Sequence, residues 1–328
     1  MKAIVYYNYG SPDVLRREEI EKPAAGNNQV LIKVRAASIN PYDWHLMRGM
    51  PYIVRIPTGL RTPKSPRLGA DVAGQVEAVG SNVTQFKPGD GVFGMCQGAF
   101  AEYVCASESA VAMKPDNLTF EQAAAVPMAG FTALQGLRDK GKIQPGQRAL
   151  INGAAGGVGT FAVQIAKSFG ADVTGVCSTR NVDMVRSIGA DRVIDYTQQD
   201  FTNSGQRYDL LFDCVGNHSF SACRRVLNPK GIYLPVGGPS GRWKIGLAGA
   251  IKRLVLSRFM SQNLIAFFLA KPSKQDLTVM HDLMATGKVT PVIDKRYAWS
   301  EVPEAIRYLE QGHARGKVVL TFEPNNKM

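Results

Sequence analysis

The sequence predicts an α/β protein in which a barrel-like β domain is followed by a doubly wound, parallel β-sheet. Three observations support this fold class. Short β-type runs fill the first third of the chain, strands and helices alternate after residue 147, and a glycine-rich turn joins the first alternating strand to its helix. A chain of 328 residues is long enough for two packed domains.

The first third contains β-type runs at residues 2–7, 29–39, 72–80, 91–95 and 100–106. Turn residues such as those at 87–90 separate the runs, which is typical of an antiparallel, barrel-like domain. The character of the chain changes near Leu118. Residues 119–139 are rich in alanine and are expected to be helical, with Thr119 as the N-cap.

The alternating part begins at residue 148. Strands are expected at 148–152, 172–177, 192–195, 209–215 and 231–237, and helices at 156–170, 181–189 and 219–227. Short connections between such elements predict a parallel, doubly wound sheet. Residues 263–270 are expected to form its last strand. The tail ends in a further strand at 317–322 and is expected to fold back onto the first domain.

The turn at 153–159 reads Gly-Ala-Ala-Gly-Gly-Val-Gly. The first βα turn of a doubly wound sheet binds the pyrophosphate of a dinucleotide, through N–H groups and the positive end of the helix dipole. We interpret Gly153 as permitting the turn, Gly156 as allowing close approach to the pyrophosphate, and Gly159 as allowing helix and strand to pack. Because Ala154 replaces the middle glycine of the usual pattern, a tight turn without a ligand remains the alternative.

The end of the second alternating strand indicates which dinucleotide binds. A site for NAD usually has an Asp or Glu there, bonded to the 2′-hydroxyl of the ribose. This chain has Ser178, Thr179 and Arg180 instead. Two hydroxyls and a guanidinium suit a 2′-phosphate, so we expect NADPH. The alternative is that one of the two hydroxyls only caps the next helix.

Composition is that of an ordinary soluble globular protein, with 45% hydrophobic and 20% charged residues. The N-terminal residues resemble a strand and not a signal peptide. The apolar stretch 254–270 is interrupted by polar residues and is too short to span a bilayer. None of the five cysteines forms a C-x-x-C pair, so we expect a reducing, cytoplasmic setting.

Positive charge is concentrated in one region. The net charge is +12, and between Asp213 and Asp276 there are ten Lys and Arg but no acidic residue. Two interpretations of this charge are possible. Residues 214–275 could form a solvated basic face, or they could bind RNA or an anionic membrane. The basic span at 241–259 has no RNA motif and no array of stacking aromatics, since Trp243 is the only tryptophan in it. We therefore expect no nucleic acid and no stable membrane insertion, and we expect residues 242–259 to form a pocket lid or a dimer element.

Five segments together resemble the medium-chain dehydrogenase/reductase superfamily, most closely its zinc-free quinone oxidoreductase and enone reductase branch. They are residues 36–49, 69–94, 123–137, 151–159 and 189–196. The resemblance implies a GroES-like β-barrel catalytic domain at 1–124 and 270–328, wrapped around a Rossmann dinucleotide-binding domain at 125–269. It also implies a homodimer joined through the last strands of the cofactor sheets, here 263–270.

Zinc-dependent members of this superfamily carry Cys at the position that matches Asn40 and His at the position that matches Asp71. This chain has neither residue there. The structural-zinc lobe with its four cysteines is also missing, since only Cys96 and Cys105 occur in that part of the chain. A zinc site needs converging His, Cys or carboxylate ligands, so we expect no metal.

The absence of a metal restricts the chemistry that we expect. A simple ketone needs a Lewis acid or a proton donor to accept hydride. Quinones and α,β-unsaturated carbonyls accept hydride on carbon and delocalise the charge onto a conjugated oxygen, where a hydrogen-bond donor suffices. We therefore expect an NADPH-dependent quinone or enone reductase, and a zinc-independent aldehyde or alcohol oxidoreductase is the alternative.

The resemblance also implies which residues form the site. Asn40 and Tyr42 are the catalytic candidates, with Tyr42 as a proton donor or oxyanion partner, although a packing role for Tyr42 is the alternative. Further cofactor-binding residues beside Asn40 are expected at Thr132, Ala155, Gly156, Gly157, Val158, Ser178, Arg180, Tyr196, Val215, Gly216, Val236, Gly237, Phe268 and Lys317.

Overall fold

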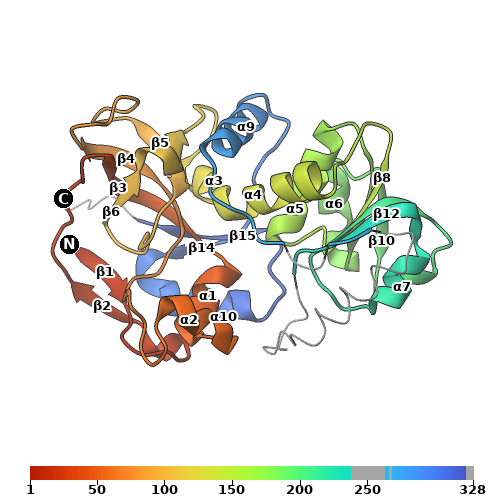
Figure 1. Ribbon diagram of the computed structural model, residues 1–328, viewed down its shortest axis with the longest axis horizontal. Helices are drawn as coiled ribbons and strands as arrows, with labels where there is room; N and C mark the ends of the chain where they lie inside the picture. The colour runs from red at the N-terminus through yellow and green to blue at the C-terminus, as the bar shows by residue number, and fades with distance from the viewer. Residues whose placement is uncertain (238–262, 266–267, 323–328) are drawn as a thin grey trace. The chain divides into compact units, whose positions relative to one another are not determined.

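The computed structural model describes residues 1–237, 263–265 and 268–322 (Figure 1). The chain divides into two compact units. The first comprises Met1–Met128, Pro272–Gly287 and Pro291–Met328, and the second comprises Ala129–Lys271 and Lys288–Thr290. Residues 238–262 and 266–267 of the basic region lie outside the described residues, and they include the whole of the expected lid or dimer element at 242–259.

The first unit is built on one large sheet and a two-stranded antiparallel sheet, β1 (Lys2–Val5) with β2 (Arg16–Glu19). The large sheet has the order β14-β15-β3-β4-β5-β7, and β6 pairs with β3. Its strands are β3 (Gln29–Ile39), β4 (Asp71–Val79), β5 (Gly91–Met95), β6 (Tyr103–Ser107), β7 (Val111–Met113), β14 (Ile293–Ala298) and β15 (Lys317–Thr321). Ile32, Val72 and Phe100 lie in the buried core of this unit.

The helices of the first unit are α1 (Pro41–Arg48), α2 (Arg55–Thr58), α3 (Phe120–Ala124), α9 (Lys274–Ala285) and α10 (Val302–Glu310). The expected helical stretch at 119–139 is divided into α3, α4 (Pro127–Gln135) and a π-helical segment at Gly136–Lys140. Pro127 has no N–H to continue α3, so it begins a new helix. The Thr119 cap is confirmed, because its hydroxyl accepts from the Gln122 N–H at 3.2 Å.

The tail of the chain folds back as expected. Strand β15 pairs antiparallel with β3, and Val319 lies opposite Ser38. The strands of the first third pair antiparallel as expected, whereas β14 of the tail pairs parallel with β15. Helix α10 lies between these two strands in sequence, and a crossover connection of this kind is what a parallel pair requires. The pairing with β3 brings Lys317 to the end of β3.

The second unit contains a parallel sheet of six strands in the order β10-β9-β8-β11-β12-β13 (Figure 1). Counted from β8, this is the order 3-2-1-4-5-6 of dinucleotide-binding folds, in which the strand order reverses next to the first strand. The strands are β8 (Arg148–Asn152), β9 (Asp172–Cys177), β10 (Arg192–Asp195), β11 (Tyr208–Asp213), β12 (Leu227–Pro235) and β13 (Asn263–Leu264). Helix α5 (Gly157–Ser168) follows β8, α6 (Val182–Ser187) follows β9, and α7 (Phe220–Arg225) follows β11.

Strand β8 shows why these segments form the centre of a sheet. Ala149, Leu150 and Ile151 are all fully buried, as expected for a strand that is covered on both faces. The last strand is shorter than expected: within the described residues β13 covers only Asn263–Leu264, and it pairs with β12 at the edge of the sheet. Across the described ranges, every helix is too short or too polar to cross a bilayer.

Candidate cofactor site and active site

The turn between β8 and α5 has the geometry of a phosphate-binding loop. Gly153 has a φ of +82°, which favours glycine. A Cβ on Gly159 would lie 2.1 Å from the carbonyl oxygen of Gly153, so helix and strand pack too closely for a side chain. A Cβ on Gly156 would meet only that same oxygen, at 3.4 Å. Packing within the protein therefore explains Gly153 and Gly159 but leaves the space beside Gly156 open.

The start of α5 supplies donors for a ligand in that space. Gly156 is the N-cap, and no side chain caps the helix there. The first N–H groups of a helix have no acceptor within it, and the positive end of the helix dipole lies at the same place. Gly157 and Val158 provide two of these N–H groups. An uncapped helix start with open space beside it fits a pyrophosphate.

The end of β9 is where the 2′-phosphate is expected. Arg180 is exposed, and the Ser178 hydroxyl accepts from the Asn181 side chain at 3.1 Å. The Thr179 hydroxyl donates to a carboxylate at 2.6 Å, that of Asp195 at the end of β10. Asp195 lies at the end of the third alternating strand, so the pattern of an acid after the second strand does not indicate it. Parallel strands end at the same edge of a sheet, which is the signal that could have indicated Asp195.

Asp195 is already occupied by protein donors. Its second oxygen accepts from the N–H and the hydroxyl of Thr197, at 2.9 and 2.8 Å, and these bonds and the one from Thr179 hold the pKa of its carboxyl below the ordinary value. Tyr196 follows it, with 56% of its surface exposed. The carboxylate therefore orders the loop that follows β10, next to the expected phosphate position.

A buried carboxylate that the sequence analysis did not single out organises the neighbouring loop. Asp213, at the end of β11, accepts from the backbone N–H groups of Val215 and Gly216 at 3.0 and 2.9 Å. It also accepts from the side chains of Asn152 and Tyr233, both at 2.8 Å. These bonds hold the loop after β11 against the end of β8.

The structure brings several of the expected cofactor residues together around Asp213. A Cβ on Gly153 would lie 2.8 Å from the side chain of Val215, and one on Gly237 would lie 2.0 Å from the carbonyl oxygen of Cys214. The Val236 N–H donates to the carbonyl of Asp213 at 2.8 Å. Half-buried Thr132 lies on α4 and half-buried Phe268 follows β13, both in the same unit. Buried Ala155 completes the set that lies in this unit.

The first unit contains the remaining expected residues, and two of them are in direct contact. The Lys317 ammonium donates to Oδ1 of Asn40 at 2.5 Å, although 277 residues separate them. The Asn40 amide nitrogen donates to Oδ2 of Asp71 at 2.9 Å, and the Lys317 ammonium lies 3.8 Å from the same oxygen. All three residues are at least 97% buried. Asn40, Asp71 and Lys317 are called the buried triad below.

Other groups complete the environment of Asp71. The Ser38 hydroxyl donates to its Oδ2 at 2.8 Å, and the Met128 N–H donates to its Oδ1 at 3.0 Å. Burial raises the pKa of the Asp71 carboxyl and lowers the pKa of the Lys317 ammonium, while the opposite charge of each partner counteracts both shifts. The opposite charge nearby is what makes burial of either charge tolerable.

The catalytic candidate Tyr42 lies next to this triad in sequence, in the first turn of α1. It is 47% exposed, whereas Asn40 is 2% exposed. Partial burial, reinforced by the charge of Asp43, raises the pKa of the Tyr42 hydroxyl, so the hydroxyl keeps its proton at neutral pH. His45, farther along α1, hydrogen-bonds the carbonyl of Met50 at 2.6 Å and stacks on Trp44. Of these side chains, Tyr42 is the one suited to donate a proton.

Asp43 is a second buried carboxyl near the triad, and it gives a testable pH dependence. It accepts from the N–H groups of Asn40 and Gly69, and burial raises its pKa to about 7, with a further contribution from the charge of Asp71. An unfolded Asp titrates near 3.9. Between about 3.9 and 7 the folded protein keeps a proton that the unfolded chain releases. This contribution to stability is complete below about pH 3.9 and is lost as the pH rises through about 7.

We expect the Asp43→Asn variant to lack this loss, which is on the order of a few kcal/mol in the wild type. The measurement is the free energy of unfolding of both proteins from pH 4 to pH 8. The difference between wild type and variant should change in favour of the variant as the pH rises. Parallel curves across this range would contradict the assignment.

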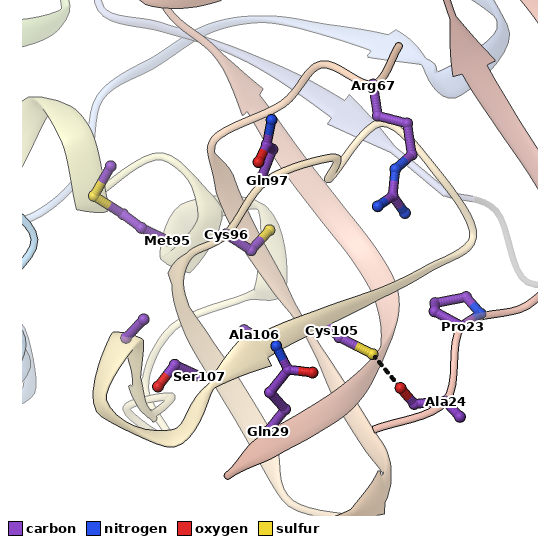
Figure 2. A pocket seen from close by; sticks show the side chains of 11 residues that line it. Pro23, Ala24, Gln29, Arg67, Met95, Cys96, Gln97, Cys105, Ala106 and Ser107 are labelled. Atoms are coloured by element: carbon purple, nitrogen blue, oxygen red, sulfur yellow. Dashed lines mark hydrogen bonds between the residues drawn. The ribbon is translucent and has the colours of Figure 1, made fainter. Parts of the chain in front are cut away.

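The first unit also has an open cavity of about 520 Å³, which no expected site residue lines. Figure 2 shows Arg67, Gln97 and Gln29 around it, together with Cys105, whose thiol donates to the carbonyl of Ala24 at 3.4 Å. Cys96 lines it as well, and burial raises the pKa of both thiols, so neither is a ready nucleophile. The cavity is therefore distinct from the residues considered above.

Metal ligands are not gathered anywhere in the part of the chain that the structure describes. No group of three or more His, Cys, Asp or Glu side chains there could hold a metal ion. At Asn40 and Asp71, the positions where the resemblance implies ligands in zinc-dependent members, the ammonium of Lys317 lies 2.5 Å from Asn40 Oδ1 and 3.8 Å from Asp71 Oδ2. A cation is thus already present between them, and this donor set does not fit zinc.

Comparison with known proteins agrees with this architecture. Residues 26–116 match the family described as "Alcohol dehydrogenase GroES-like domain", and residues 188–320 match the family described as "Zinc-binding dehydrogenase". The "Chloroplast envelope quinone oxidoreductase homolog" of Arabidopsis thaliana is 34% identical over 98% of both chains. The "NADPH-dependent alkenal/one oxidoreductase, chloroplastic" of the same plant is 35% identical over 98% of this chain and 79% of its own.

A solved structure extends the agreement to three dimensions. The quinone oxidoreductase from Coxiella burnetii has a TM-score of 0.84 and 32% sequence identity, covering 98% of this chain and 99% of that one. The expected fold class, a GroES-like domain with a Rossmann sheet, is confirmed. The chain therefore belongs to the medium-chain dehydrogenase/reductase superfamily of oxidoreductases, in its quinone oxidoreductase and enone reductase branch.

Proposed function

We propose that this protein is an NADPH-dependent reductase of quinones or α,β-unsaturated carbonyls that works without a metal. The observation that carries the proposal is the uncapped start of α5 beside Gly156, at the point where the strand order of the sheet reverses. The names of the two Arabidopsis relatives, a quinone oxidoreductase homolog and an alkenal/one oxidoreductase, support the acceptor class.

In this proposal the second unit holds the cofactor and the first is the catalytic domain, with boundaries near residues 124 and 270. Bound NADPH supplies the hydride. The N–H groups at the start of α5 bind the pyrophosphate, and Ser178 and Arg180 bind the 2′-phosphate. Tyr196, the loop at 215–216, the strand end at 236–237, Thr132 and Phe268 surround the rest of the dinucleotide. Asn40 and Lys317 are proposed near its nicotinamide end.

The acceptor needs only a hydrogen-bond donor, because hydride transfer to an enone or quinone leaves its charge on oxygen. Tyr42 is proposed to give that donor and then the proton, since its hydroxyl is half-exposed and protonated at neutral pH. The buried triad supports metal independence, because the ammonium of Lys317 lies where zinc-dependent relatives are expected to hold a metal.

An acceptor screen tests the function. We expect the purified protein to oxidise NADPH with quinones and enones and to be at least about 100-fold slower with the matching saturated aldehydes and ketones, because these lack the conjugation that disperses charge. Prolonged chelation, followed by removal of the chelator, should leave the rate with enones unchanged. Equal rates with saturated carbonyls would favour the aldehyde reductase alternative, and a rate that is lost on chelation and restored by zinc would contradict metal independence.

The quaternary structure and compartment are further parts of the proposal. We propose a homodimer through the edge of the sheet at β13, because an exposed edge strand needs cover. The molar mass by light scattering checks this, and a monomer at micromolar concentration would contradict it.

All five cysteines are free, which supports a reducing compartment such as the cytoplasm. The RNA and membrane alternatives depend on a basic region of which residues 238–262 and 266–267 lie outside the described residues.

A further inference from the structure

The buried triad fixes the orientation of the Asn40 side chain. A carboxamide has an acceptor end and a donor end that are similar in shape, and its partners decide which way it lies. Lys317 can only donate, and Asp71, as a carboxylate, can only accept. Asn40 therefore has to direct its oxygen to Lys317 and its nitrogen to Asp71, at 2.5 and 2.9 Å. The opposite orientation would put like groups together on both sides.

Within the described residues, this arrangement leaves N–H bonds of Asn40 and Lys317 without an acceptor. The amide nitrogen of Asn40 has two N–H bonds, and within the described residues only Asp71 accepts from it. The Lys317 ammonium has three N–H bonds and makes one hydrogen bond there, to Asn40, besides its ion pair with Asp71. Asn40 and Lys317 are buried to the same degree, 2% and 3% exposed, so burial does not distinguish them. Asn40 is singled out because its two partners fix the direction of its remaining N–H bond.

We propose that Lys317 and Asp71 are positioning residues that clamp Asn40 from its two ends, so that its second amide N–H is held in one direction for a ligand oxygen. The clamp uses an internal cation at the place where zinc-dependent relatives are expected to use a metal. The inference rests on the proposed function for the identity of the ligand, which is the cofactor carboxamide or the acceptor carbonyl.

The pattern of contacts argues for a clamp and against simple charge neutralisation. Neutralising Asp71 needs only an ion pair, but the shorter contact of Lys317 is to the neutral Asn40, at 2.5 Å against 3.8 Å to Asp71. Asp71 itself is held by Ser38 and by the Met128 N–H, so it cannot turn to follow Lys317. Lys317 of β15 and Asp71 of β4 thus contact the two ends of the carboxamide, and Ser38 and the start of α4 hold Asp71 in place.

The test is a pair of double variants, Lys317→Met with Asp71→Asn and Lys317→Gln with Asp71→Asn. Both remove the two charges together, so neither leaves a buried charge without a partner. Glutamine can still donate to Asn40, and methionine cannot. We expect kcat to fall about tenfold in the methionine variant with KM within about twofold, and to recover in part in the glutamine variant. Lys33→Met, which removes an exposed lysine of β3, is the matched control and should behave as wild type.

Wild-type kcat in the methionine variant, or equal kcat in the two double variants, would overturn the clamp and leave the triad a structural ion pair. A second measurement does not depend on whether the variants fold. The side-chain amide protons of Asn40 in the wild type should exchange with solvent slowly in NMR spectra, and fast exchange would also overturn the clamp. If the wild type reduces no acceptor at all, the proposed function fails, while amide exchange still tests the clamp on its own.

Discussion

Replacing Gly156 with alanine is expected to weaken NADPH binding strongly while leaving the folded protein nearly intact. Gly156 has a φ of −82° and a ψ of 175°, which alanine adopts without strain. The added methyl group would meet only the Gly153 oxygen, at 3.4 Å, so the protein has room for it. It would occupy the space assigned to the pyrophosphate, and losing charge-assisted hydrogen bonds there should weaken binding by about 100-fold or more.

Gly159→Ala is the matched control, because it adds the same methyl group one turn into α5. There the Cβ would lie 2.1 Å from a backbone oxygen, so helix and strand must separate. We expect this variant to lose about 1–3 kcal/mol of stability or more. Titration of intrinsic fluorescence with NADPH and thermal unfolding distinguish the two effects. A Gly156→Ala protein that binds NADPH like the wild type would contradict the site.

Arg180→Ala is expected to weaken NADPH far more than NADH. A charge-assisted bond to the 2′-phosphate is worth about 1.5–3 kcal/mol, so affinity for NADPH should fall about 10- to 150-fold while NADH changes little. The nearby Asp195 increases the need for this cation, because its negative charge lies one hydrogen bond from Thr179, at 2.6 Å. Without Arg180 that charge should repel the phosphate.

The control for this variant is Arg186→Ala, which removes an exposed guanidinium from the neighbouring helix α6. A general loss of positive potential would weaken NADPH equally in both variants, whereas a specific phosphate contact affects Arg180 alone. Dissociation constants for both nucleotides are the measurement. Equal losses of NADPH and NADH in the Arg180 variant would show that the guanidinium does not select the 2′-phosphate.

The second unit shows which elements local sequence patterns predict correctly. Its strands at 148–152, 172–177 and 192–195 lie where the sequence predicts them, because buried parallel strands are short apolar runs between turn residues. The glycines of the turn could be interpreted one by one, because the positive φ of Gly153 and the close packing at Gly159 both arise within a segment of seven residues. The resemblance to a known family added the fold of the first unit, which β-type runs alone did not specify.

The sequence by itself determined the fold class, the dinucleotide turn and the lack of an acid after the second strand. Tertiary structure decided that Asp195 reaches Thr179 and that Lys317 clamps Asn40 against Asp71. It also decided that β14 joins the sheet parallel to β15. The reason is separation along the chain. Hydrophobic periodicity and turn residues can be recognised within a dozen residues. A hydrogen bond between residues 40 and 317 forms only when β15 pairs with β3, and no local pattern predicts that pairing.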